Sequence, residues 1–260
     1  MCLLVLAWQV HPRYRLIVAA NRDEFHERPT APMAPWPAPD NLLAGKDLRA
    51  GGTWLGVDRM RRFGVVTNYR EHQRPSPDAP SRGQLIPSYL REHANPRDYL
   101  NGLEPRAADF SGFNLLLADG DSLWYASNRA RPFARALAPG VYGLSNELLD
   151  TPWPKLRRVR GRFETWLASS EPASPQGLFE LLADPVQVGE DSELPRTGLT
   201  LEWERLLSAP FVRNPEYGTR SSSVLLLEPS GALYLAERRF DPTGTSTGES
   251  TWRLGPGQWV

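Results

Sequence analysis

The sequence has very little cysteine and no excess of charge of either sign. Its 260 residues include one cysteine, Cys2, so no disulfide can form within the chain, which is typical of a reducing compartment. Basic and acidic side chains number 30 each, so the formal net charge is zero and neither a nucleic acid nor an anionic membrane is expected as a partner. These absences favour an ordinary soluble protein whose single thiol is free to react.

A long apolar run is also missing. The chain starts with MCLLVLAWQV, but this run stops at Gln9, His11 and Pro12, and about 20 apolar residues are needed to cross a bilayer. The start has neither the basic segment nor the small-residue cleavage site of a secretory signal peptide. We therefore expect a mature cytoplasmic protein without an integral membrane segment.

Motifs for metal, nucleotide and serine chemistry are absent as well. The four histidines show no zinc-type spacing, and no G-x-x-x-x-G-K-[ST] phosphate loop occurs. GLSNE, at 143–147, lacks the second glycine of a nucleophile elbow. The basic stretch KLRRVRGR, at 155–162, favours a solvated helix face over an anion site. No metal or resident cofactor is expected.

The hydrophobic pattern predicts an α+β protein. Short apolar runs predict strands at 2–8, 14–20, 52–58, 62–68, 140–146, 219–228, 231–239 and 250–254, with a hairpin over 112–128. Helical spacing predicts helices near 83–94, 156–167, 175–183 and 201–208, the first two capped by Ser81 and Thr151. The proline-rich stretch 28–40 is expected to be a surface loop. No repeat or linker divides the chain, so 1–260 is predicted to be one domain.

Cys2 directly follows the initiator methionine. If Met1 is removed, Cys2 carries a free α-amino group beside its own thiol. An α-amine has a pKa of about 7.7–8.0 and a thiol about 8.5, so the amine can act as base to the thiol, as in N-terminal nucleophile catalysis. Free cysteine is also among the most buried residue types, and position alone favours this plainer interpretation.

Four polar residues follow the second predicted strand: Asn21, Arg22, Asp23 and Glu24. Hairpin geometry brings them close to Cys2, where a carboxylate would hold the α-ammonium group and a guanidinium would favour the thiolate. The same residue types are typical of a solvated turn in which Asn and Asp bond to local backbone. Taken alone, these residues favour the solvated turn.

Four blocks of the sequence together resemble the NRDE-domain family, also called the transport and Golgi organisation protein two family. They are MCLL with AANRDEFHERPT, GGTWLGVDRMRRFGVVTNYR, GLSNELLDTPWPK, and YGTRSSSVLLL with LAERRFD, and the match runs from residue 1 to about 241. The resemblance implies the fold of the N-terminal nucleophile hydrolases, a four-layer αββα sandwich. In its motifs the chain is most similar to choloylglycine hydrolases and penicillin V acylases.

The resemblance also implies a set of site residues. Cys2 matches the nucleophile, and Asp23 matches the carboxylate that binds the nucleophile's amine. Asn68 and Asn146 match the amides that position substrate and form the oxyanion hole. Arg220 matches an arginine that lowers the pKa of the thiol. The remaining motif residues are Asn21, Arg22 and Glu24.

One position departs from the acylase pattern. The acylases have an arginine three residues before the aspartate, and that position is Ala20 here. Arg22 is the nearest substitute. We treat Arg22 as shifted by one residue from the arginine of the acylases. Because strand residues alternate between faces, we expect Arg22 to point to the opposite face of the strand. The departure is consistent with the NRDE subgroup.

Three functions are consistent with these observations. The first is a cysteine amidohydrolase that cleaves linear amide C–N bonds in a small-molecule substrate. The second is a non-enzymatic carrier of haem or another hydrophobic ligand, because the family is linked to haem mobilisation and to lipid or acyl-CoA homeostasis. The third is a scaffold in which the motifs are structural. No C-x-x-C-H haem attachment site occurs, and the candidate axial ligands are Cys2, His26 (expected in a surface loop), Met33, His11, His72 and His93.

Overall fold

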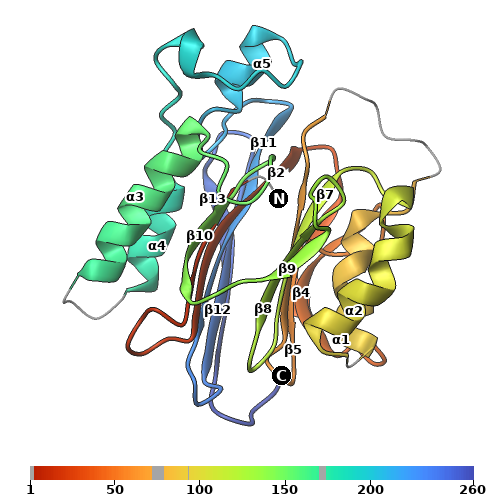
Figure 1. The fold of residues 1–260 in the computed structure, drawn as a ribbon. Coiled ribbons are helices and arrows are strands. Elements are labelled where there is room, and N and C mark those ends of the chain that lie inside the picture. The colour runs from red at the N-terminus through yellow and green to blue at the C-terminus, as the bar shows by residue number, and fades with distance from the viewer. Residues whose placement is uncertain (1–2, 72–78, 93, 170–173) are drawn as a thin grey trace.

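The fold consists of two antiparallel sheets with helices on their outer faces (Figure 1). A computed structural model describes residues 3–71, 79–92, 94–169 and 174–260. Sheet A has the strand order β10 (Gly140–Leu144), β1 (Leu3–Trp8), β2 (Leu16–Phe25), β11 (Tyr217–Leu227), β12 (Leu233–Phe240) and β13 (Ser246–Leu254). Sheet B has the order β3 (Thr30–Pro35), β4 (Leu42–Asp47), β5 (Leu55–Asp58), β6 (Phe63–Asn68), β7 (Phe113–Ala118), β8 (Leu123–Ser127) and β9 (Ala134–Ala136).

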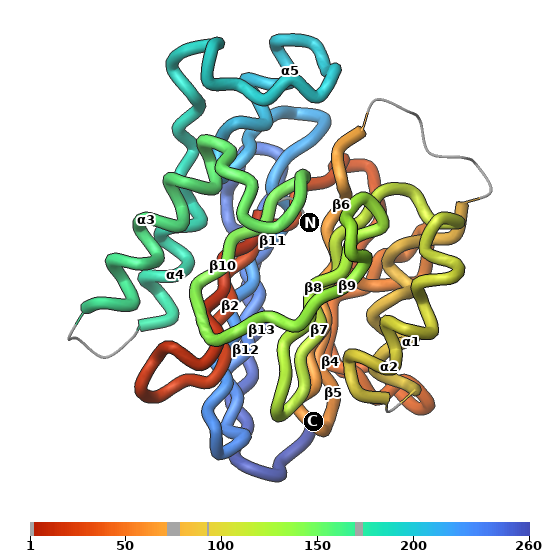
Figure 2. Tube along the Cα trace, viewed as in Figure 1, coloured from red at the N-terminus to blue at the C-terminus, as the bar shows by residue number. Residues whose placement is uncertain are grey.

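The helices give the molecule its outer layers. Figures 1 and 2 show α3 (Pro154–Ala168) and α4 (Pro175–Leu182) against sheet A, and α1 (Leu85–Glu92) and α2 (Pro96–Leu103) against sheet B. A short helix, α5 (Leu201–Leu206), lies at the upper end of Figure 1. The predicted αββα sandwich is therefore confirmed. Within the described ranges, no helix combines the length and the apolar character that spanning a membrane requires.

The first two strands read as apolar runs because sheet A is covered on both faces. All residues of β1 are buried, as are the first eight of β2. Even-numbered residues such as Val18 pack between the sheets, and odd-numbered residues such as Ile17 pack beneath α3 and α4. Continuous hydrophobic strands are typical of sheets buried in this way.

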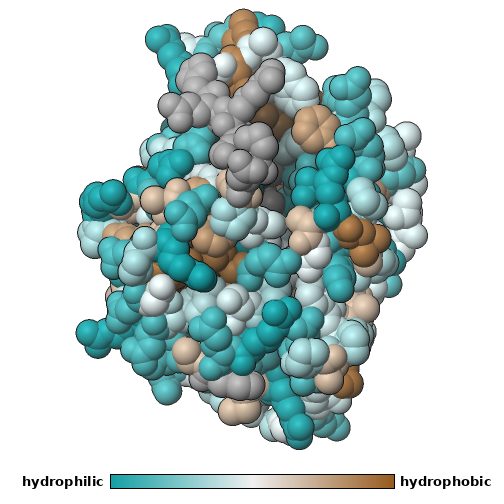
Figure 3. Space-filling view, turned by 90° about the vertical axis from the view of Figure 1, so that its right-hand side faces the viewer, coloured by the Kyte–Doolittle hydropathy of each residue, from teal (hydrophilic) through white to brown (hydrophobic). Residues whose placement is uncertain are grey.

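On the outer face of sheet B, α1 packs over two glycines, Gly56 of β5 and Gly64 of β6. Ile86 is fully buried. A Cβ added to Gly64 would lie 3.1 Å from Ile86 Cγ2, and one added to Gly56 would lie 3.6 Å from the same atom. The two glycines thus allow the helix to approach the strands closely. The outward face of this side is mainly hydrophilic, with apolar patches of limited size (Figure 3), as expected for amphipathic helices.

Several local predictions were wrong. The stretch 28–40 contains the edge strand β3, where prolines are tolerated because one side of the strand forms no ladder bonds. Neither Ser81 nor Thr151 caps a helix through its side chain: α3 begins at Pro154 with Trp153 as N-cap, and Ser81 precedes a single 3₁₀ turn. The sequence reading also missed β4 and α2.

The largest correction concerns the polar quartet. The strand β2 continues to Phe25, so 21–24 lie inside the sheet, and the solvated turn is wrong. Asn21 is 0% exposed, Arg22 4% and Asp23 3%. The reason is that β11 pairs with β2 from Leu16 to Phe25, which supplies backbone partners beyond the apolar run.

Replacing Ile86 with alanine should destabilise the protein by about 2–5 kcal/mol, because removing most of a fully buried side chain leaves a cavity next to the glycines of β5 and β6. The free energy of unfolding from urea titration measures this. Glu92→Ala, at an exposed position on the same helix, is the control and should change stability by less than about 0.5 kcal/mol. If Ile86→Ala lowered the free energy of unfolding by as little as the control does, this packing of α1 on sheet B would be contradicted.

Candidate functional site

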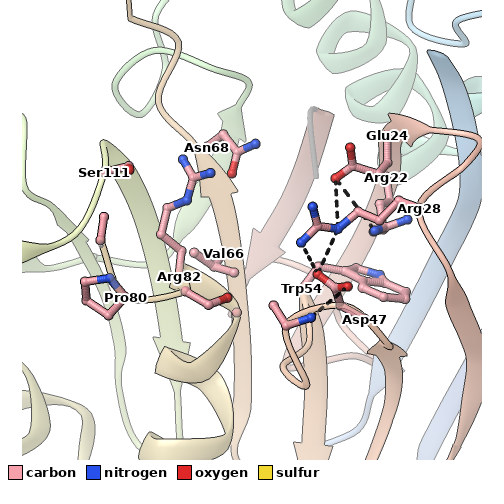
Figure 4. A pocket seen from close by; sticks show the side chains of 14 residues that line it. Arg22, Glu24, Arg28, Asp47, Trp54, Val66, Asn68, Pro80, Arg82 and Ser111 are labelled. Atoms are coloured by element: carbon pink, nitrogen blue, oxygen red, sulfur yellow. Dashed lines mark hydrogen bonds and ion pairs between the residues drawn. The ribbon is translucent and has the colours of Figure 1, made fainter. Parts of the chain in front are cut away.

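A polar cavity of about 260 Å³ lies between the ends of the two sheets. Figure 4 shows Arg22, Glu24, Arg28, Asp47 and Trp54 on one side of it. Asn68, Arg82, Pro80, Ser111 and Val66 lie on the other side. The cavity therefore takes its walls from both sheets and from the segment that precedes α1.

The first wall is organised by ion pairs. Arg28 donates to Asp47 Oδ2 from Nε at 3.0 Å and from Nη2 at 2.7 Å. Glu24 Oε2 lies 3.8 Å from both Arg28 Nε and Arg22 Nη2. This pairing lowers the pKa of Asp47 despite its partial burial, which acts the other way. The four charges hold one another in place at the cavity edge.

Arg22 is the buried member of that wall. Its guanidinium lies over the Trp54 ring, 4.4 Å from the centroid, and burial lowers its pKa. Within the described residues, Arg22 Nη1 and Trp54 Nε1 are buried and donate no hydrogen bond. Arg22 shares the inter-sheet face with Ala20, which packs in the same core as Trp54. The expectation that Arg22 faces away was wrong, because the two positions are two residues apart and strand faces alternate with period two.

Asn21 and Asp23 project from the other face of β2. Thr219 Oγ1 donates to Asp23 Oδ1 at 2.7 Å. Asn21 Nδ2 donates to the carbonyl oxygens of Leu182 and Pro210, each at 2.9 Å, and its Oδ1 accepts from Ser222 Oγ at 2.6 Å. Asn21 thus joins the strand to the end of α4, while Asp23 is held as a buried carboxylate beside β11.

Cys2 lies outside the described residues. The first described residue, Leu3, pairs with Asn21 across β1 and β2. The predicted role of Cys2 as nucleophile remains a prediction.

The structure brings Asn68 and Asn146 together. Asn146 Nδ2 donates to the backbone carbonyl of Asn68 at 2.9 Å, and the Arg70 amide donates to the Asn146 carbonyl at 2.7 Å. Asn68 ends β6 and its side chain is exposed at the cavity, whereas Asn146 is 4% exposed. Asn146 Oδ1 is buried and accepts no hydrogen bond from the described residues. Their predicted part in an oxyanion hole is untested.

Arg220 lies at a bulge in β11, where the register with β2 shifts between Thr219 and Ser221. Its Nη1 donates to the backbone carbonyls of Phe25, His26 and Arg28 at 2.9, 3.2 and 3.2 Å. The guanidinium therefore fixes the turn that carries Arg28 into the cavity wall. Its predicted effect on the thiol remains a prediction.

Sequence reasoning missed Glu237, the most deeply buried carboxylate of this region. It is 1% exposed, on the inter-sheet face of β12. Its Oε1 accepts the Met33 amide at 2.9 Å and lies 3.7 Å from Arg239 Nη1. Burial raises the pKa of Glu237, and this effect outweighs the lowering of the pKa by the Met33 amide, Arg239, the Ser221 hydroxyl and Arg22. A charged residue within the LAERRF strand was the available signal.

The candidate haem ligands are engaged in internal contacts. His26 Nε2 donates to the Asn214 carbonyl at 3.1 Å, and Met33 is 1% exposed in the core between the sheets. His11 Nδ1 accepts from the amides of Arg13 and Tyr14. His72 and His93 lie outside the described residues. In the part of the chain that the structure describes, no cluster of His, Cys, Asp and Glu is arranged for a metal ion.

The basic stretch 155–162 on α3 was predicted to be a solvated helix face, which is only partly correct. Lys155 is 3% exposed, so it does not belong to a solvated face. Arg158 and Arg162 share the carboxylate of Asp184, and Arg160 pairs with Asp150 at 3.0 Å. The stretch fastens the helix to neighbouring segments.

Comparison with known proteins shows the family to which the chain belongs. The model of the family Transport and Golgi organisation 2 matches residues 1–242. The chain belongs to this family. Its Mus musculus homolog, "Transport and Golgi organization 2 homolog", is 34% identical over 269 residues, covering 96% of this chain and 97% of that protein. The Homo sapiens homolog is also 34% identical, over 92% of each chain, and the Drosophila melanogaster protein is 30% identical over 94% and 95%.

Among solved structures, the chain is similar to a Caenorhabditis elegans ortholog of N-acylethanolamine-hydrolyzing acid amidase. The TM-score is 0.46 and the identity 12%, over 88% of this chain and 93% of that one. The resemblance to the Transport and Golgi organisation 2 family drawn from the four sequence blocks is confirmed by the family match and by the curated relatives.

Replacing Glu237 with glutamine should change how stability depends on pH. Because its pKa in the folded protein is raised above the ordinary 4.5, the folded state keeps this proton to higher pH than the unfolded chain does. The stability contributed by protonated Glu237 is therefore full below about pH 4.5 and decreases as pH rises through the raised pKa. Glu237→Gln keeps an acceptor for the Met33 amide and cannot ionise.

We therefore expect the unfolding free energy of Glu237→Gln, minus that of the wild type, to grow as pH rises from about 4.5 to about 8. Urea titrations at several pH values measure this difference. Glu164→Gln, at an exposed position on α3, is the control and should follow the wild type. A difference that stays constant with pH would contradict a raised pKa.

Proposed function

We propose that this member of the Transport and Golgi organisation 2 family is a cysteine N-terminal nucleophile hydrolase that cleaves linear amide C–N bonds. The observation that supports it most is the burial of Asp23 in β2, the strand that pairs with the N-terminal strand β1. Asp23 lies two residues beyond Asn21, which forms the last described pair with Leu3. A buried carboxylate at this position is suited to hold an α-ammonium group.

In the proposed reaction, removal of Met1 leaves Cys2 with a free α-amine. The amine takes the thiol proton, and Asp23 stabilises the resulting ammonium. The thiolate forms a bond to the substrate carbonyl carbon, and the ammonium then gives the proton to the amide nitrogen as the C–N bond breaks. Water, deprotonated by the same amine, hydrolyses the thioester to a carboxylic acid and restores the thiol.

The amides supply the stabilisation of the developing oxyanion. An asparagine side chain has two N–H donors. Asn146 uses Nδ2 toward the Asn68 carbonyl, and its second N–H is the donor that we assign to the oxyanion. The Asn68 side chain, at the cavity, is assigned as the partner donor. Fixed donors at the site of developing charge typically contribute a rate factor of about 10²–10³ each.

The size and the lining of the cavity indicate which part of a substrate it could bind. At about 260 Å³ it is smaller than the range of about 300–1,000 Å³ typical of drug-sized ligands. Its lining combines three arginines with two carboxylates (Arg22, Arg28, Arg82, Glu24 and Asp47). We therefore propose that it receives the compact, polar part of the substrate next to the scissile amide.

Haem carriage is the alternative, and the residues at this site do not fit haem. The cavity is small and polar, the His26 Nε2 proton is bonded to a backbone carbonyl, and Met33 is enclosed in the core. We expect no saturable shift of the haem absorption band and no protection from unfolding when haem is added to the protein. Saturation at one haem per chain, lost in His26→Ala or Met33→Leu, would favour the carrier function instead.

The nucleophile is tested first by intact mass. Untagged protein should lack Met1, and brief iodoacetamide treatment should alkylate Cys2 rapidly below about pH 8, because an adjacent amine promotes the thiolate. An amide substrate screen then follows with Cys2→Ala, which should abolish turnover without changing the melting temperature. Retained Met1, or activity in Cys2→Ala, would overturn the proposal.

The role of Asp23 is tested with a matched pair of substitutions. Asp23→Asn should lower kcat by about 10²–10⁴, because the ammonium formed in the reaction loses its counter-charge. Asp184→Asn is the control, since that carboxylate is also buried but bonds to Arg158 and Arg162 on α3 and to the Val186 amide. Equal losses of activity in the two variants would contradict a direct role for Asp23.

A further inference from the structure

A buried polar network lies between the sheets, beside the two site asparagines. Its centre is Asn114 on β7, which is 0% exposed and shares the inter-sheet face of β7 with Leu116 and Ala118. Tyr125, on the neighbouring β8, is 4% exposed on the same face. Polar groups in an apolar layer are costly unless they are hydrogen-bonded, so their partners indicate what they serve.

All of the hydrogen-bonding atoms of the Asn114 side chain are used. Its Nδ2 donates to the Glu147 carbonyl at 2.9 Å and to Thr67 Oγ1 at 3.2 Å. Its Oδ1 accepts from the Tyr125 hydroxyl at 2.7 Å. Turning the amide over would place Oδ1 against the Glu147 carbonyl, two acceptors together, so the partners fix its orientation.

These partners flank both site asparagines. Thr67 precedes Asn68, and its hydroxyl also lies 3.2 Å from the Ser145 carbonyl, to which it donates. Glu147 follows Asn146. The Tyr125 oxygen accepts the Leu149 amide at 3.2 Å. The segment 145–149 is thus held at three successive points by side chains of β6, β7 and β8.

Asn146 depends on this support because its own side chain is weakly anchored. Among the described residues, its Oδ1 accepts no hydrogen bond and its Nδ2 donates one, to the Asn68 carbonyl. The direction of its amide is therefore set mainly by the backbone on either side of it. An oxyanion donor must be held in place before the reaction, and supporting residues determine how well.

We propose that Asn114 and Tyr125 are positioning residues that fix the orientation of Asn146 toward the reacting atoms. The inference rests on the proposed function for its effect on rate, but the orientation of Asn146 can be measured without turnover. Neither residue touches the substrate in this scheme. They act through the backbone of 145–149 and through Thr67.

The test compares two tyrosine-to-phenylalanine substitutions in the same region of the fold. Tyr125→Phe removes the hydroxyl that bonds Asn114 and Leu149. Tyr89→Phe, on α1, removes another buried hydroxyl, which donates to the Ala118 carbonyl at 3.1 Å, at the other end of β7 from Asn114. Both should lower the melting temperature, Tyr125→Phe the more, since it loses two buried hydrogen bonds and Tyr89→Phe loses one.

The first readout is hydrogen exchange of the Arg70 amide, which donates to the Asn146 carbonyl. NMR should show it exchanging about tenfold faster in Tyr125→Phe than in Tyr89→Phe. The second readout is steady-state kinetics: kcat should fall about 10–100-fold in Tyr125→Phe alone, the usual effect of losing a supporting contact, with KM unchanged. Asn114→Asp, which keeps an acceptor for Tyr125 but loses both donors, should behave like Tyr125→Phe.

The outcomes separate this inference from the proposed function. An unchanged Arg70 exchange rate in Tyr125→Phe overturns the positioning role, whatever the activity. Faster exchange with unchanged kcat overturns it as well, because Asn146 would then not need to be held. A wild-type protein without amidase activity overturns the proposed function, and the exchange result then decides alone whether Asn114 and Tyr125 orient Asn146.

Discussion

The pairing of β2 with β11 is the interaction on which the rest of the site depends. It runs from Leu16 to Phe25 on β2 and continues after the apolar residues have ended. By supplying backbone partners there, β11 carries the polar quartet into the interior, where a turn would have left it in water. A bulge between Thr219 and Ser221 then takes Arg220 out of the alternating pattern. Bulges commonly re-aim side chains near functional sites, and this one turns Arg220 toward the carbonyls that follow the strand.

The quartet is divided between the two faces of the strand. Asn21 and Asp23 face the helical layer and the 207–219 segment, where their partners are backbone carbonyls and hydroxyls. Arg22 and Glu24 face the cavity, where their partners are an indole ring and other charges. One short motif therefore serves two purposes: it anchors the strand on one side and sets the electrostatics of the cavity on the other.

The second half of the site comes from both sheets and is held by different means. Asn68 ends a strand, and Asn146 lies in the segment after β10, at the edge of sheet A. Side-chain hydrogen bonds from Thr67, Asn114 and Tyr125 join these parts within an otherwise apolar layer. Glu237 makes a comparable link at another point, from β12 to the amide of Met33 on β3. Polar groups between the sheets thus connect the two halves at the end where the cavity lies.

Sequence patterns were sufficient for the layered α+β architecture, for most strands and helices, and, through the four motif blocks, for the family. The apolar runs of β1 and β2 and the helical spacing of α3 are local signals, and local signals survive in a sequence read alone. The end of β2 was not readable, because it depends on pairing with β11, far away in the chain. The edge strand β3 was hidden by its prolines, and the N-cap of α3 is Trp153, which makes no side-chain capping bond. The face of Arg22 was readable from strand parity but was misjudged. The contacts of Arg220 and the links from Asn114 to 145–149 were decided only by tertiary structure, since hydrogen bonds between residues far apart in the chain leave no periodic trace in the sequence.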